Sequence, residues 1–169
     1  MPIDDLRWYN ALRAIHDTVS SDEAGAIIDV ARLAAVSDGK TTIDELAVIV
    51  MLRRIVTELA GGRMPHPSAA IDASRLEAIG TALTATGPRE LAYACAMIVM
   101  MHDLQLTSEE RDLATELAKA LVIEPDRAKA IAAQMEALVR EDTGGLVATT
   151  GETVTGTETT LVANTEKPR

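Results

Sequence analysis

Aromatic residues are scarce in this sequence, which has one tryptophan, two tyrosines and no phenylalanine among its 169 residues. Proteins that bind single-stranded nucleic acids usually stack the bases on aromatic side chains, so the composition argues against that class of partner. Basic residues are also few: 16 lysines and arginines face 26 aspartates and glutamates, which gives a net charge of −10. This charge disfavours nucleic acids and anionic membrane surfaces and favours cations or basic proteins.

The sequence has a single cysteine and no long hydrophobic run. Cys95 has no second cysteine to pair with, which fits a reducing compartment. Residues 1–10 lack the basic and apolar segments of an export signal, and the longest apolar run, 91–101, is well short of the roughly 20 residues of a membrane-spanning helix. We therefore predict a cytoplasmic protein that is not inserted in a membrane.

What the sequence does contain is helical periodicity, with apolar residues every three or four positions as far as residue 140. Three helices are predicted near residues 3–19, 21–36 and 42–60, followed by a Pro-containing linker at 61–68. Four more helices are predicted after it: a short one ending near Gly87, and three beginning at Pro88, Thr107 and Pro125. The inward stripe of the first helix is predicted to be Leu6, Tyr9, Leu12, Ile15 and Val19. The fold class is therefore all-α, a compact bundle of about seven helices.

The composition changes after residue 140 to threonine, glycine, valine and glutamate. We predict a helical domain at 1–140 and a Thr/Gly-rich tail at 141–169. The tail is expected to be disordered, with a strand that pairs with a partner's sheet as the alternative.

An internal repeat appears when the sequence is shifted by 65 residues. The shift superposes Asp38 on Asp103, Thr42 on Thr107, Asp44 on Glu109 and Glu45 on Glu110. An apolar helix precedes each copy and an amphipathic helix follows it, which predicts two related helical hairpins packed face to face.

The same residues carry a family resemblance. The segment Ala34-Ala35-Val36-Ser37-Asp38-Gly39 through Glu45-Leu46, supported by residues 97–103 and 106–110, resembles the TerB-like family named for tellurite-resistance proteins. The resemblance covers roughly residues 20–140, and the second copy departs from it with Leu104 in place of the expected glycine. It implies a helical bundle with a cytoplasmic role in metal or oxyanion stress and no established catalytic activity.

The acidic residues of the two copies are the candidate metal site. Its primary members are Asp38, Glu45, Asp103 and Glu110, with Asp44, Glu109 and His102 as secondary members. Oxygen ligands of this kind suit Ca²⁺ or Mg²⁺. A structural role is the alternative, because Thr42 with Glu45 and Thr107 with Glu110 form the S/T-x-x-E capping box of a helix start, as Ser20 with Glu23 also do. An EF-hand is excluded, since Ala34 and Val36 would occupy its first and third ligand positions.

Catalytic motifs are not evident in the sequence, so a non-enzymatic role is predicted. The first hypothesis is a TerB-like stress module whose acidic turns bind divalent cations or present charge to a membrane-bound or cytosolic partner of a resistance system. The alternative is a protein-interaction adaptor whose helical body or C-terminal tail docks on a partner protein, and the third is an enzyme with dispersed carboxylates. The oligomeric state is left open.

Overall fold

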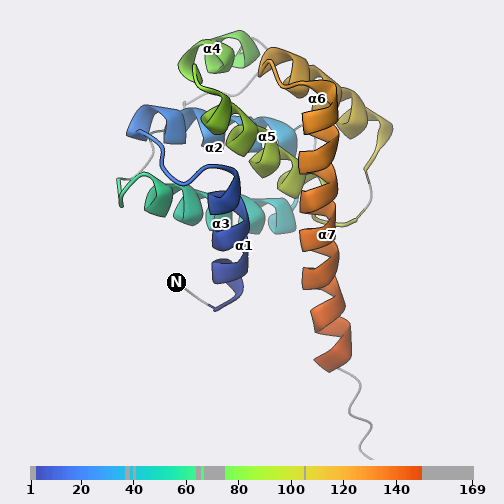
Figure 1. Ribbon diagram of the computed structural model, residues 1–169. Coiled ribbons are helices and arrows are strands. Elements are labelled where there is room, and N and C mark those ends of the chain that lie inside the picture. The colour runs from blue at the N-terminus through green and yellow to red at the C-terminus, as the bar shows by residue number, and fades with distance from the viewer. Residues whose placement is uncertain are drawn as a thin grey trace, which may run out of the picture.

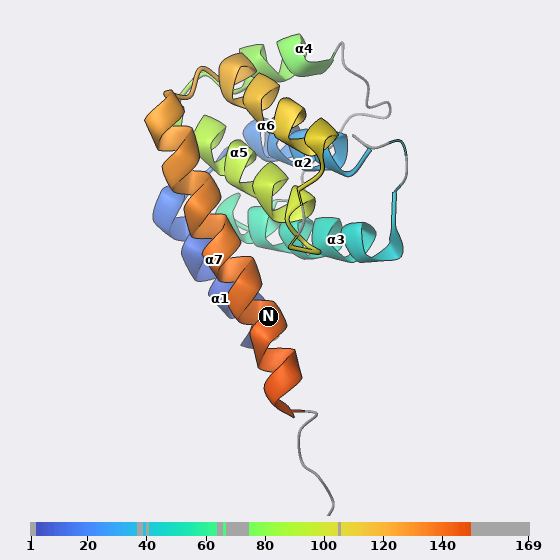
Figure 2. The same ribbon diagram turned by 90° about the vertical axis from the view of Figure 1, so that its right-hand side faces the viewer.

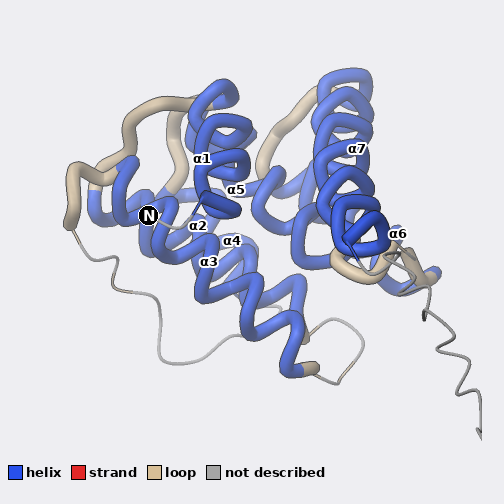
Figure 3. Tube along the Cα trace, turned by 90° about the horizontal axis from the view of Figure 1, so that it is seen from below, coloured by secondary structure: helices blue, strands red, loops and turns tan. Residues whose placement is uncertain are grey.

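The computed structural model describes residues 3–36, 39, 41–63, 66, 75–104 and 106–149, and within these ranges it contains only helices and loops (Figure 3). Seven helices follow one another along the chain (Figure 1). They are α1 (Ile3–Ile15), α2 (Ser21–Ala35), α3 (Ile43–Leu59), α4 (Arg75–Ala82), α5 (Thr86–Met100), α6 (Ser108–Ala120) and α7 (Pro125–Thr149). The predicted all-α class is confirmed. Within the described ranges, no helix combines the length and the hydropathy that crossing a bilayer requires.

The centre of the molecule is the contact between α2 and α5, which is the most extensive interface between helices. Every residue of α5 from Leu91 to Met100 is buried, and so is every residue of α2 from Ala24 to Ala31. Both helices are apolar around most of their circumference, so each is stable only when other helices enclose it. Figures 1 and 2 show α5 running through the middle of the bundle with the other helices around it.

The helices before the two hairpins are placed in a related way. Helix α1 precedes the α2–α3 hairpin and contacts α3 and α5, whereas α4 precedes the α5–α6 hairpin and contacts α6 and α2. Exchanging α2 with α5 and α3 with α6 therefore turns the contacts of α1 into those of α4. The repeat extends to three helices in each half, and α7 has no counterpart among the described helices.

The two hairpins also turn with the same hydrogen bond. The Gly39 N–H donates to the carbonyl oxygen of Val36 at 3.1 Å, and the Leu104 N–H donates to that of Met101 at 2.9 Å. Gly39 has a φ of 77° and Leu104 a φ of 63°, so both adopt the left-handed conformation. Leu104 thus keeps the turn of the first copy, although it lacks the conformational freedom of glycine.

Helix α1 differs from its prediction in length and in orientation. It ends at Ile15 rather than near residue 19, because the chain turns so that the Val19 N–H donates to the carbonyl oxygen of Leu59 at 3.2 Å. Leu6, predicted to face the core, is 49% exposed, while Trp8 and Leu12 are buried. The large apolar surface of Trp8 decides which face of α1 is buried.

Helix α7 runs past the predicted end of the helical body at residue 140 and reaches Thr149. Its 25 residues make it about 38 Å long, and its last turns extend beyond the rest of the bundle (Figures 1 and 2). Arg7 of α1 holds this helix by donating to the carbonyl oxygen of Leu138 at 3.1 Å and pairing with Glu141 at 3.6 Å. The remainder of the predicted tail, 150–169, lies outside the described residues.

Candidate functional site

Two acidic residues of the repeat, Glu45 and Glu110, act as helix caps. The Glu45 carboxylate accepts the backbone N–H of Thr42 at 2.6 Å, and the Thr42 hydroxyl accepts the N–H of Glu45 at 3.1 Å. Glu110 and Thr107 make the same pair of bonds at 2.7 and 3.2 Å. Both glutamates are buried, so water reaches them poorly. These hydrogen bonds pair the N–H groups at the two helix starts and the carboxylates with each other. The predicted capping boxes are confirmed, as is the one formed by Ser20 and Glu23.

The remaining candidate ligands are dispersed. Asp38 lies outside the described residues, and Asp44 and Asp103 are exposed. Glu109 accepts a hydrogen bond from the Ser108 hydroxyl at 3.0 Å, and the Nδ1 of His102, in the turn after α5, lies 2.9 Å from the carbonyl oxygen of Val99. No group of three His, Cys, Asp or Glu side chains in the described part of the chain is arranged to hold a metal ion. Cation binding at these turns stays a prediction.

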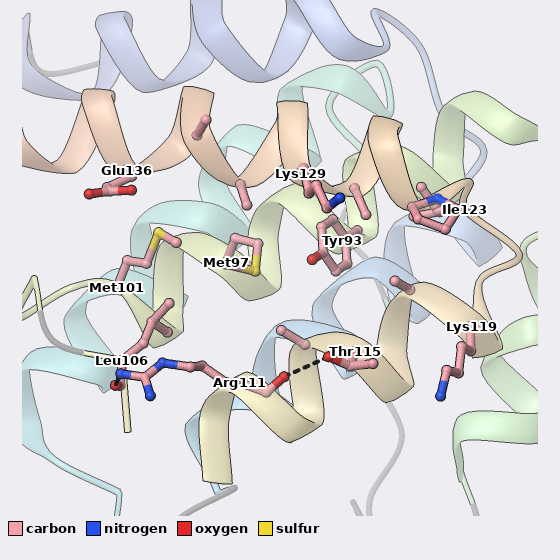
Figure 4. Close-up of a pocket in the computed structure, with 16 residues that line it drawn as sticks. Tyr93, Met97, Met101, Leu106, Arg111, Thr115, Lys119, Ile123, Lys129 and Glu136 are labelled. Carbon is pink, nitrogen blue, oxygen red and sulfur yellow. Dashed lines mark hydrogen bonds between the residues drawn. The ribbon is translucent and has the colours of Figure 1, made fainter. Parts of the chain in front are cut away.

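A groove lies between α6 and α7 in the described part of the chain. It has a volume of about 600 Å³, which is within the range of sites that bind small molecules and peptide side chains. Helix α5 forms its floor, α6 one wall and α7 the other (Figure 4). The two walls belong to helices that are joined only by a short turn between Ala120 and Pro125.

The floor of the groove is apolar except for one hydroxyl group. Tyr93, Met97 and Met101 form the floor and are all buried, with Tyr93 only 4% exposed. The hydroxyl oxygen of Tyr93 points into the space between α6 and α7 (Figure 4), and no hydrogen bond joins it to any described residue. Burial raises the pKa of this hydroxyl, so it stays protonated and can donate a hydrogen bond.

The walls of the groove carry small side chains. Ala114 and Ala118 line it from α6, and Ala128, Ala132 and Ala133 line it from α7. Alanine lets another backbone approach a helix closely. Leu106 and Ile123 close the two ends of the α6 wall with larger, half-buried side chains.

The rim of the groove is basic, in a chain whose net charge is −10. Arg111, Lys119 and Lys129 line it, and Glu136 is the one acidic residue among the lining side chains. Glu136 is already paired with Arg140 at 2.5 Å. Lys129 lies 3.7 Å from Asp126, but both side chains are largely in water, so that pair is weak. The Arg111 guanidinium also donates to the carbonyl oxygen of Leu106 at 2.7 Å, and the Lys119 ammonium points away from α7 (Figure 4). Cations therefore outnumber acids among the residues that line the groove, but they do not all point into it.

Sequence reasoning missed the groove because it depends on how α6 and α7 both pack on α5 while leaving a space between them. Two signals were nevertheless present. Tyr93 is the one polar interruption in the apolar run of α5, and Arg111, Lys119 and Lys129 are basic residues on two helices that follow one another in an acidic chain. Neither signal identifies a site until the fold brings the residues together.

Comparison with known proteins gives no further assignment: no family model, no curated protein and no solved structure matches the chain. The resemblance to the TerB-like family therefore rests on the residues quoted above and stays a prediction.

Proposed function

We propose that this chain is a non-enzymatic binding module that takes up an apolar segment of a partner protein in the groove between α6 and α7. The observation that carries the proposal is the floor of the groove, where a buried tyrosine hydroxyl without a described partner points into an apolar trough. In the free protein, water that enters the open groove hydrogen-bonds to this hydroxyl, so a ligand that dehydrates the floor must supply an acceptor in its place.

The chemistry of the lining residues supports binding. The floor and walls offer apolar surface, one hydroxyl and peripheral cations. Met97 and Met101 have flexible, polarisable side chains that adapt to different apolar partners. Arg111, Thr115 and Ala133 line the groove and are exposed, so the groove is open to solvent along one side. An open groove suits a segment of a partner protein better than a small molecule, which binds best where it is enclosed.

A pair of matched substitutions tests the site. Ala133→Trp places a large side chain on the exposed wall of the groove, whereas Ala130→Trp makes the same change one turn away at an exposed position that does not line it. A displayed library of random 16-residue peptides is selected on the wild-type protein and on both variants. We expect peptides that are enriched on the wild type and on Ala130→Trp and lost on Ala133→Trp. Equal enrichment on all three proteins, or none, would refute the proposal.

A role in metal or oxyanion stress is the function that the TerB-like resemblance implies, and it too is a proposal. Its support is the repeated acidic helix start, in which Glu45 and Glu110 occupy equivalent buried positions. Calorimetry with Ca²⁺, Mg²⁺, Mn²⁺ and Zn²⁺ tests the cation part. Saturable heat that Glu45→Gln removes would support it, and the absence of heat at millimolar metal would exclude it.

A further inference from the structure

The charge and shape of the groove restrict the kind of segment that fits it. Three cationic side chains and one acidic side chain, Glu136, line the groove around an apolar floor, in a molecule whose net charge is −10. Acidic side chains beside an apolar stripe complement this pattern, whereas basic ones would meet like charge.

The walls of the groove favour a helix over an extended segment. An extended peptide gains affinity by pairing with the edge of a sheet, and the described ranges contain no strand. A helix instead lays an apolar stripe into a trough, and the alanines of α6 and α7 allow its backbone to come close. Helix α6 has 13 residues and is about 20 Å long, which matches three to four turns of a docked helix.

The molecule already docks one of its own helices in this manner. Helix α1 lies against α3 and α5, buries Trp8 and Leu12, and pairs its Asp5 with Arg54 of α3. An apolar stripe with an adjacent carboxylate that meets a basic residue is thus a packing solution that this fold uses.

Building on the proposed function, we propose that the partner segment is an amphipathic α-helix whose apolar stripe is flanked by acidic residues. Its stripe lies on Met97, Met101 and the alanine walls, and its carboxylates face Arg111 and Lys129. The exposed Lys119 side chain turns toward the bound helix by rotation about its flexible stem. A polar side chain or carbonyl of the helix accepts the hydrogen bond of the Tyr93 hydroxyl.

The sequences of the selected peptides test this inference first. Peptides that depend on an open groove, and are therefore lost on Ala133→Trp, are expected to share apolar residues at i, i+3 or i+4, and i+7 with an excess of Asp and Glu beside them. Groove-dependent peptides without this spacing, or with basic flanks, would overturn the inference and leave the proposed function standing. Failure of the proposed function is recognised separately, because no groove-dependent peptide would then be found.

Affinity measurements on one such peptide, made as a synthetic labelled peptide, test the roles of the residues. The double variant Lys119→Glu/Lys129→Glu should bind about tenfold more weakly, whereas Arg53→Glu, a charge reversal at an exposed position of α3 outside the groove, should bind as the wild type does. Raising the salt concentration should weaken wild-type binding more than that of the double variant. Unchanged affinity in the double variant would contradict the acidic flank.

Tyr93→Phe separates a binding role from a structural one. We expect about fivefold weaker peptide binding, the loss of one hydrogen bond, with an unchanged or higher melting temperature of the free protein. Wild-type affinity in this variant would remove Tyr93 from the inference. Self-association of the wild-type protein that Ala133→Trp abolishes would assign the groove to a second copy of the chain, and the inference would fail.

Discussion

The two halves of the molecule, α1–α3 and α4–α6, have the same arrangement of helices but differ in the side chains that they expose. Both halves cap the last helix with a Thr and a Glu and pack their middle helix on the other half. Helix α3 then exposes the apolar side chains of Ile43, Leu46 and Val50, while the positions 65 residues later on α6 hold Ser108, Arg111 and Thr115. Helix α7 packs on α5 and faces α6 across the groove. The groove therefore depends on α7, the helix that lies outside the repeat.

The halves also differ in backbone strain at the ends of their last helix. Helix α3 is preceded by Gly39 and followed by Gly61, both with positive φ. Leu104 corresponds to Gly39 in the repeat, and Val122, like Gly61, is the second residue after its helix; their φ values are 63° and 54°. The hydrogen bonds that end the helices are alike: Gly61 and Val122 donate to Glu58 and Lys119 at 3.0 Å. Strained positions of this kind are enriched near functional sites, and these two flank the helix that forms one wall of the groove.

The largest expected effect concerns the shared core. Leu33 of α2 and Ile98 of α5 are buried and lie 65 residues apart. Leu33→Ala and Ile98→Ala should each lower the free energy of unfolding by about 2–5 kcal/mol, because each leaves a cavity in the buried core. Urea denaturation measures both. A loss below about 1 kcal/mol for either one would show that its half contributes little to a common core.

The second prediction compares the pH dependence of stability in variants of Val30 and Cys95, which occupy equivalent positions in α2 and α5. Burial raises the pKa of the Cys95 thiol from 9.0 to about 12. Below pH 9 the thiol is protonated in both the folded and the unfolded protein, so it does not change the pH dependence of stability. Above pH 9 the thiol of the unfolded protein loses its proton while that of the folded protein keeps it. The free energy of unfolding then falls by about 1.4 kcal/mol per pH unit. Denaturation of Cys95→Ala between pH 9 and 11 should lack this contribution, so its free energy of unfolding should fall less steeply with pH, by about 1.4 kcal/mol per pH unit. Val30→Ala should keep the wild-type slope, and equal slopes for all three proteins would contradict the burial of the thiol.

The third prediction compares the two capping boxes. Thr42→Ala and Thr107→Ala should each cost about 0.5–2 kcal/mol, since each leaves helix N–H groups without an acceptor. Glu45→Gln and Glu110→Gln should cost little, because glutamine accepts the same backbone hydrogen bond. Thermal melts with and without millimolar Ca²⁺ measure these effects. A calcium-induced rise in the melting temperature that Glu45→Gln abolishes would show that the carboxylate coordinates a metal as well as capping α3.

The smallest expected effect lies at the two turns. Gly39→Ala should cost about 1 kcal/mol, because alanine is strained at positive φ. Leu104→Gly should stabilise the protein by less than about 1 kcal/mol, since relief of that strain is partly offset by the greater entropy of glycine in the unfolded chain. Chemical denaturation measures both changes in the free energy of unfolding, which we expect to have opposite signs. Destabilisation by both substitutions would mean that the Leu104 side chain contributes packing that its exposure conceals.

Most of the fold was predictable because it follows from local patterns. The Thr and Glu pairs located the starts of α3 and α6, and the unbroken apolar run located the buried centre of α5. The end of α7 was not predictable from composition, because Arg7 of α1 contacts it from 131 residues away in the sequence. The orientation of α1 was predicted wrongly at Leu6, since periodicity alone did not weigh the burial of Trp8 against that of smaller residues.

The site was less predictable than the fold. The sequence singled out carboxylates, and the structure shows Glu45 and Glu110 capping their own helices. The groove depends on side chains from α5, α6 and α7 that are spread between Tyr93 and Glu136. Such a site becomes visible only when the crossing of three helices is known.

Methyl NMR of the methionines tests the central claim most directly. The protein is labelled at its methionine methyl groups and titrated with a peptide selected on the wild type. Met97 and Met101 lie in the groove floor, whereas Met51 lies on α3 outside it. We predict that the Met97 and Met101 signals shift on titration while that of Met51 stays in place. A shift of Met51 with unchanged Met97 and Met101 signals would contradict the account.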